Sequence, residues 1–185
     1  CSKSAEQQNP LSTKESLPSR IVSLAPGSTE ILFALGAESS LAARTDLCNY
    51  PAETAEYPSV GGFDGKTFSL ETVLSFNPDL VLLNTFMHGH LIQSLQDLGI
   101  TVYNSDAQSI SDIYTDILEI GKILGKNESA NELVNSMKQG IEKPTEPGNI
   151  SVYWEVWNAP YMSIGKNSFI NDVIEASGAV NIFDD

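Results

Sequence analysis

The stretch RIVSLAPGSTEILFALG, Arg20–Gly36, decides the fold class. Its apolar run Ile21–Ala25 is typical of a short strand, and Pro26-Gly27 ends the run, because proline cannot donate to a sheet and glycine accepts unusual backbone angles. Ser28-Thr29-Glu30 then opens a helical pattern, with a hydroxyl to cap it and a carboxylate near its positive end, and Gly36 closes it. A strand followed at once by a helix predicts the first half of a βαβ unit. Open α/β sheets bind ligands at such a turn, although this stretch taken alone favours an ordinary turn without a ligand.

Strands and helices alternate along the rest of the first hundred residues. The apolar run DLVLLN, Asp79–Asn84, is typical of a parallel strand that is covered on both faces. The alternation predicts a mostly parallel sheet in a doubly wound lobe. The other predicted elements are strands at Leu41–Thr45 and Ile100–Tyr103, an extended segment at Pro58–Phe63, a helix from Ser69 that ends before Asn77-Pro78, and a helix from about His88 to Leu98.

The second half of the chain begins with a long helical region. Helical spacing predicts helices at Ser109–Gly125 and Glu128–Ile141, and a linker follows at Pro144–Asn149. A strand at Ile150–Trp157 and a helix capped by Asn167 or Ser168, ending near Gly178, then open a second lobe. Because a domain below roughly 40 residues rarely folds alone, we expect most of this C-terminal lobe to be absent from the chain.

Several motifs carry a resemblance to a known family. After the first stretch come TDLCNYP, SVGGF and FSLETVLSFNPDLVLL, in this order. Together they resemble the substrate-binding proteins of the ABC importers for vitamin B12, haem and iron–siderophore complexes, with the B12-binding branch the most similar. The resemblance implies an α/β fold of two Rossmann-like lobes joined by a long helix, with the C-terminal lobe truncated here. The predicted parts are a tether at 1–19, an N-terminal lobe at 20–104, a linking helical region at 105–148 and the start of a C-terminal lobe at 149–185.

Composition excludes some classes of protein. The formal net charge of −14 over 185 residues argues against a nucleic-acid partner, which needs a clustered basic surface. No run approaches the ~18 apolar residues of a membrane span. If Cys1 is otherwise engaged, Cys48 has no cysteine left for a disulfide.

The first residues suggest a membrane anchor. Residues 1–19 are rich in Ser, Glu, Gln and Pro and hold too few apolar side chains to fold, so we expect them to be disordered. A leading cysteine before such a stretch resembles a mature bacterial lipoprotein, in which Cys1 would carry the lipid. The alternative is a chain boundary that happens to fall at a cysteine.

Aromatic residues near predicted strand ends are the candidate ligand contacts. A planar corrin or porphyrin needs aromatic walls and few polar groups, and the resemblance places such walls in the cleft between the lobes. The polar turn Pro26-Gly27-Ser28 could add backbone N–H donors, from its two residues after the proline, for ligand amides or carboxylates. For each aromatic residue alone, a role as core or loop filler is equally expected. The aromatic candidates are Tyr50, Phe63, Phe86, Trp157 and Tyr161.

His88 and His90 are the candidate metal ligands. Neutral imidazole binds iron and cobalt well, but residues two apart on a helix do not share a face. The two histidines could therefore share a metal only in a loop, and exposed histidines at a helix start are the simpler interpretation. In the B12-binding branch, the acidic residue that matches Glu71 docks onto the membrane permease; a glutamate that complements the helix dipole is the plainer role.

The sequence favours a binding protein over an enzyme. It contains no GxSxG, HExxH, P-loop or CxxC motif. The resemblance implies a monomeric, lipid-anchored, extracytoplasmic receptor that delivers a cobalt corrinoid to an ABC-importer permease, with haem or a ferric siderophore as the alternative ligand. No cofactor is expected besides this ligand. The alternative from another class is a tetrapyrrole metal chelatase, which also uses two α/β lobes with a histidine near the cleft.

Overall fold

The computed structural model describes residues 17–62, 69–141 and 150–183. Predictions for the tether at 1–19, apart from its last three residues, and for Cys1, Phe63 and the linker therefore lie outside the described residues. No helix in the part of the chain that is described is long and apolar enough to cross a bilayer.

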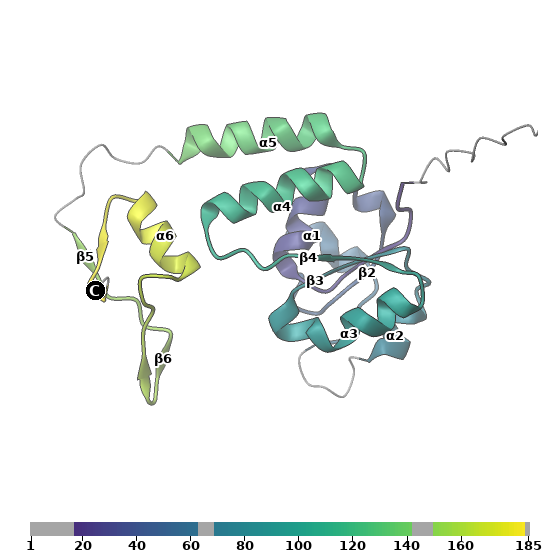
Figure 1. Ribbon diagram of the computed structural model, residues 1–185, viewed down its shortest axis with the longest axis horizontal. Helices are drawn as coiled ribbons and strands as arrows, with labels where there is room; N and C mark the ends of the chain where they lie inside the picture. Colours follow the sequence, from purple (N-terminus) through teal and green to yellow (C-terminus); the bar gives the residue numbers. More distant parts are fainter. Residues whose placement is uncertain (1–16, 63–68, 142–149, 184–185) are drawn as a thin grey trace, which may run out of the picture.

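A four-stranded parallel sheet is the centre of the fold (Figure 1), with the strand order β2-β1-β3-β4. Helices connect the strands, so the predicted doubly wound α/β lobe is confirmed. The elements are β1 (Ile21–Ser23), α1 (Pro26–Ala34), β2 (Leu41–Arg44), α2 (Leu70–Leu74), β3 (Leu80–Leu83), α3 (Thr85–Asp97) and β4 (Thr101–Asn104), with short 3-10 helices η1 (Glu38–Ser40) and η2 (Ala52–Glu56) on either side of β2.

Both faces of this sheet are buried. Along β3, Leu80 and Leu82 point into one apolar cluster with α1 and the later helices, whereas Val81 and Leu83 join another cluster with α2 and α3. Alternate residues of a strand face opposite sides, so the continuous run LVLL supplies two cores at once. The whole of β3 is inaccessible to solvent, as predicted for a parallel strand between two layers of helices.

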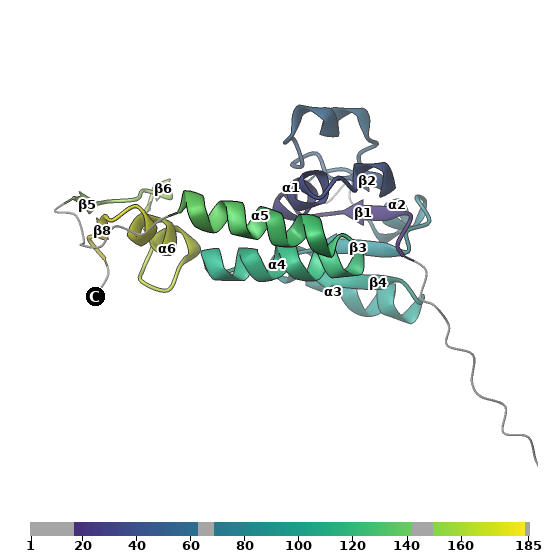
Figure 2. The ribbon, with the colours of Figure 1, turned by 90° about the horizontal axis from the view of Figure 1, so that it is seen from above.

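The helical region after the sheet is two helices. They are α4 (Ile110–Ile123), which Ser109 caps, and α5 (Asn127–Gly140). The helices pack along each other and extend past one end of the sheet (Figures 1 and 2). The resemblance implied one long linking helix in this region. The structure has two helices here, because the chain turns at Gly125, whose φ is +66°.

The C-terminal part lies at the far end of this helix pair (Figure 2). It contains the parallel strands β5 (Ser151–Val152) and β8 (Val180–Asn181), the hairpin of β6 (Trp157–Asn158) and β7 (Tyr161–Met162), and α6 (Phe169–Ala176) with Ser168 as its cap. The predicted single strand Ile150–Trp157 is wrong, because β8 offers only two residues to pair with β5. The predicted boundaries between the parts stay predictions.

Two helix starts also differ from the sequence prediction. Ala25 is the N-cap of α1, so the expected hydroxyl cap is wrong, and Ser28 and Thr29 lie buried inside the first helical turns. Pro26 fits the first turn because the N–H that proline lacks has no acceptor there. Helix α3 starts at Thr85 rather than His88, because the amide oxygen of Asn84 accepts a hydrogen bond from the N–H of Met87.

Gly121 sets the spacing between α4 and α5. A Cβ at this position would lie 2.5 Å from the Cβ of Ala130 and 3.3 Å from the carbonyl oxygen of Lys126. We therefore expect Gly121→Ala to force the helices apart and to lower the free energy of unfolding by about 1–3 kcal/mol, measured by urea denaturation.

Gly140→Ala is the matched control, since a Cβ there meets nothing within 4 Å. This variant should be neutral or slightly more stable, because alanine favours helix more than glycine does. Equal stability of the Gly121 and Gly140 variants would contradict close packing of the two helices.

Candidate functional site

A groove of about 660 Å³ lies between the N-terminal lobe and the C-terminal part. One wall is one side of α1, from Gly27 to Ala34, with Tyr50 and Ser105; the floor is the pair α4 and α5, and the other wall is α6. The volume is within the range of small-molecule pockets, about 300–1,000 Å³. The groove therefore opens at the carboxyl edge of the parallel sheet, where such folds bind ligands.

The walls of the groove are mostly apolar. On α6, Phe169 and Val173 recur at helical spacing and face apolar residues of α4 and α5. Polar groups are few and lie toward the sheet edge or the end of α6. The apolar lining from the helices is Ile31, Ala34, Ile110, Ile113, Ile117, Leu133, Met137, Ile141, Phe169, Val173 and Ala176, and the polar lining is Glu30, Tyr50, Ser105 and Ser177.

The first turn of α1 brings backbone donors to the groove. Gly27 lines it, and the N–H groups of a first helical turn have no acceptor inside the helix. Thr29 is held beneath, because its hydroxyl donates to the hydroxyl of Ser23 at 2.8 Å. Pro26 and the fully buried Ser28 do not line the groove, so ligand contacts from these two residues stay predictions.

Among the described residues, Tyr50 is the one predicted aromatic contact that lines the groove. Tyr50 lines it and is 66% exposed. Phe86 is 93% exposed at the start of α3 and is outside the groove lining, as are Trp157 and Tyr161 on the β6–β7 hairpin. Tyr161 instead lines a smaller hollow of about 330 Å³ in the C-terminal part. The groove lining therefore gives no support to ligand contacts from Phe86, Trp157 and Tyr161, which stay untested predictions.

Asp106 fixes the sheet edge beside the groove. Its carboxylate accepts hydrogen bonds from the backbone N–H of Thr85 at 2.9 Å and from the side-chain amides of Asn84 and Asn104 at 2.7 Å each. Burial alone would raise the pKa of Asp106, but these donors outweigh burial and hold the pKa below its ordinary value. The end of β4 is thereby joined to the start of α3.

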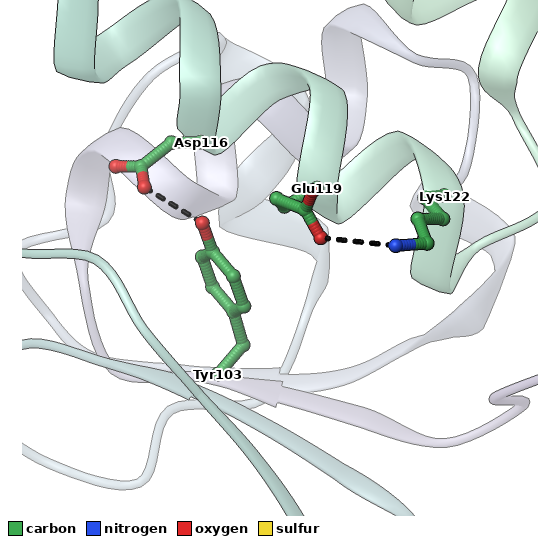
Figure 3. Close-up of polar contacts among 4 residues, drawn as sticks. All are labelled: Tyr103, Asp116, Glu119 and Lys122. Carbon is green, nitrogen blue, oxygen red and sulfur yellow. Dashed lines mark hydrogen bonds and ion pairs between the residues drawn. The ribbon is translucent and has the colours of Figure 1, made fainter.

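A second carboxylate holds α4 against the sheet. Asp116 is buried and accepts hydrogen bonds from the hydroxyl of Tyr103 at 2.7 Å, drawn in Figure 3, and from the hydroxyl of Ser105. Burial and the bond to Asp116 raise the pKa of Tyr103. Glu119 and Lys122 in the same view form an ion pair on the exposed side of α4. Asp116 therefore fixes Ser105 at the groove.

A direct hydrogen bond joins the floor of the groove to the wall that α6 forms. The backbone N–H of Ile110, in the first turn of α4, donates to a carboxylate oxygen of Asp172 on α6 at 2.7 Å. An acidic side chain is favourable at a helix N-terminus. Sequence reasoning missed α6 as a wall, although its apolar residues at helical spacing were a usable signal.

The two histidines lie on different sides of α3. His88 is buried and His90 is exposed, so this helix does not let the pair share a metal ion. Burial, with a smaller effect of the nearby His90, lowers the pKa of His88. Within the described ranges, no group of three or more His, Cys, Asp or Glu side chains could hold a metal ion, and ligation by either histidine alone stays a prediction.

Glu71 lies in the first turn of α2. A hydrogen bond from Ser69 lowers the pKa of this exposed carboxyl, with a further contribution from the backbone. The side chain is therefore charged and open to a partner, as the docking hypothesis requires, and it also complements the helix dipole.

Removal of the Asp106 carboxylate should weaken the sheet edge. We expect Asp106→Ala to lower the free energy of unfolding by about 1 kcal/mol at neutral pH. Because the folded-state pKa is depressed, this contribution is present above the ordinary carboxyl pKa of about 3.9 and is lost as pH falls through the folded-state pKa. The difference between wild type and variant should therefore shrink in acid, as measured by denaturation at several pH values.

Asp97→Ala is the control, since this exposed carboxylate accepts one hydrogen bond, from Gln93. A pH-independent difference between wild type and Asp106→Ala, or an equal loss in the Asp97 variant, would contradict the role of Asp106.

Comparison with known proteins identifies close likenesses. Among curated proteins, the chain is 35% identical over 176 residues to the "Uncharacterized ABC transporter substrate-binding lipoprotein YvrC" of Bacillus subtilis (strain 168), which covers 89% of this chain and 55% of that protein. It is 26% identical over 171 residues to the "Vitamin B12-binding protein" of Vibrio campbellii (strain ATCC BAA-1116), with 89% and 61% covered. The chain thus spans somewhat more than half the length of these relatives.

A solved structure shares the fold. The crystal structure described as a possible iron-binding (periplasmic solute-binding) protein from Staphylococcus epidermidis ATCC 12228 superposes with a TM-score of 0.78 at 30% identity, over 91% of this chain and 69% of that one. The model of the family described as periplasmic binding protein matches residues 21–185. The chain therefore belongs to the periplasmic binding protein family.

Proposed function

We propose that the protein is the substrate-binding component of an ABC importer and captures a metal chelate in the groove between its two parts. The observation that carries this proposal is the apolar groove at the carboxyl edge of the sheet, with backbone donors at one end. Large, mostly apolar walls with few polar groups suit a bulky organic ligand. A small oxyanion would instead require many hydrogen-bond donors.

A cobalt corrinoid is the ligand that we propose first. The relative from Vibrio campbellii is named for vitamin B12, and Tyr50 offers an exposed ring to a planar macrocycle. The solved structure from Staphylococcus epidermidis, described as possibly iron-binding, supports an iron chelate, such as haem or a ferric siderophore, as the second candidate. The tetrapyrrole chelatase is disfavoured, because the family is one of binding proteins.

The proposed partners follow from the transport role. A permease in the membrane would receive the ligand, and Glu71 on the surface of α2 is the docking residue that we propose on this lobe. The relative from Bacillus subtilis is named a lipoprotein, which supports an extracytoplasmic location with lipid on Cys1. We propose that the tethered protein acts as a monomer.

Tyr50 provides a test of the groove. We expect Tyr50→Ala to weaken cyanocobalamin binding by about tenfold, because an aromatic contact contributes about 0.5–1.5 kcal/mol beyond the area that it buries. Trp157→Ala, which removes an aromatic ring outside the groove lining, should change affinity by less than about twofold. Calorimetric titration measures both variants.

The opposite pattern, a large loss for Trp157→Ala and none for Tyr50→Ala, would move the site to the β6–β7 hairpin. Haem titrated in parallel tests the second ligand, and preference for haem over every corrinoid would reject the corrinoid.

Glu71 should act in docking and not in capture. Glu71→Ala should slow uptake by the importer reconstituted with this protein and leave ligand affinity unchanged, because surface charge acts mainly on encounter with a partner. Glu128→Ala, an exposed first-turn glutamate on α5, is the matched control. Loss of ligand affinity in Glu71→Ala would contradict the docking role.

A further inference from the structure

A second hollow adjoins the groove. It has a volume of about 620 Å³ and lies along α1, η1 and η2. Glu30, Ala34 and Tyr50 line both spaces. A ligand seated in the apolar groove against Tyr50 can therefore extend past this residue into the second hollow.

The second hollow is acidic. Four glutamates line it, and no lysine or arginine among the described residues lines either space. The guanidinium of Arg44, which is near η2, is engaged by the backbone oxygens of Thr54 at 2.8 Å and Thr45 at 2.9 Å. No described residue forms an ion pair with these glutamates, which are Glu30, Glu38, Glu53 and Glu56.

Glu38 adds a shielded carboxylate oxygen to the wall of the hollow. Its Oε2 atom is shielded from solvent and has no hydrogen-bond partner among the residues that the structure describes. A shielded carboxylate oxygen without a donor is costly. Because this atom is shielded, a ligand in the hollow acts on it only through charge: a cationic group would offset part of the cost, whereas an anionic group would increase it.

Aromatic rings that line the second hollow also attract cations. The rings of Phe33 and Tyr57 meet edge to face, with centroids 5.7 Å apart, and both residues line the hollow together with Tyr50. Aromatic faces attract cations within about 6 Å of the ring centroid. Carboxylates and aromatic faces together are suited to a positive group on an organic ligand.

We propose that this pair of spaces selects its ligand by charge: it takes a metal chelate with an apolar body and a net positive charge, and it rejects anionic chelates. The inference rests on the binding function proposed above. Among corrinoids, it favours cationic aquocyanocobinamide, which lacks the nucleotide phosphate, over neutral cyanocobalamin. It disfavours haem, which carries two carboxylates, and anionic ferric catecholates, because the four glutamates repel negative charge.

Titration of the three chelates against the protein tests the inference. At low ionic strength, affinity should fall in the order aquocyanocobinamide, cyanocobalamin, haem. The difference between the first two should shrink at high salt, because added ions screen exposed charges.

A triple variant locates the effect. Glu30→Gln with Glu53→Gln and Glu56→Gln should weaken aquocyanocobinamide by about tenfold at low salt, since ~1.4 kcal/mol corresponds to a factor of ten. Cyanocobalamin should lose much less. The control is a second triple variant with the same net charge, Glu128→Gln with Glu132→Gln and Glu155→Gln, at exposed glutamates outside both spaces. This control should leave the ratio of the two affinities unchanged.

The outcomes separate this inference from the function on which it rests. If corrinoids bind but the ratio is the same in both triple variants, or if haem binds most tightly, the charge selection is wrong and the binding function stands. If no corrinoid, haem or ferric siderophore binds, the proposed function fails and the inference fails with it.

Discussion

Burial of both faces of the parallel sheet is the constraint on which the rest of the structure depends. The strands β1 and β3 have no accessible surface, so each must present apolar side chains to both sides at once. Helices must then cover both faces: α2 and α3 cover one, and α1 with the α4–α5 pair covers the other. Because β1 and β3 are parallel and each is followed by a helix, their connections emerge at one edge. That edge is where the groove opens.

The polar side chains near this edge are used mainly to hold backbone in place. Asp106 joins the ends of β3 and β4, Asp116 fixes Ser105, and Asp172 binds the first turn of α4 from the C-terminal part. With these carboxylates committed, apolar helix faces remain for the groove, and glutamates that form no ion pair with any described residue remain beyond Tyr50. An acidic protein with a formal charge of −14 thus places four glutamates beside its groove, and we propose that their charge discriminates between ligands.

Sequence patterns predicted the N-terminal lobe well, because a run such as LVLL and a cap such as Ser69 or Ser109 have local causes. The patterns failed where the local structure depends on contacts with distant parts of the chain. Strand pairing at β5 stops where β8 ends, and Asn84 acts as a helix cap although it follows an apolar run. The isoleucines of α4 showed one apolar face, but the pattern could not show that Ile120 packs only in the sheet cluster while Ile110 lines the groove. Tyr50 was found from its place near a strand end, whereas α6 was missed because its apolar face is also typical of an ordinary core helix.

The central claim is that a metal chelate binds between α1 and α6, and hydrogen exchange with and without aquocyanocobinamide tests it most directly. Binding in the groove should slow exchange at residues 27–31 on the first turns of α1 and at residues 169–177 along α6, because ligand contact suppresses local opening. Residues 157–162 of the β6–β7 hairpin should change little. Protection confined to this hairpin, with none on α1 or α6, would contradict the account.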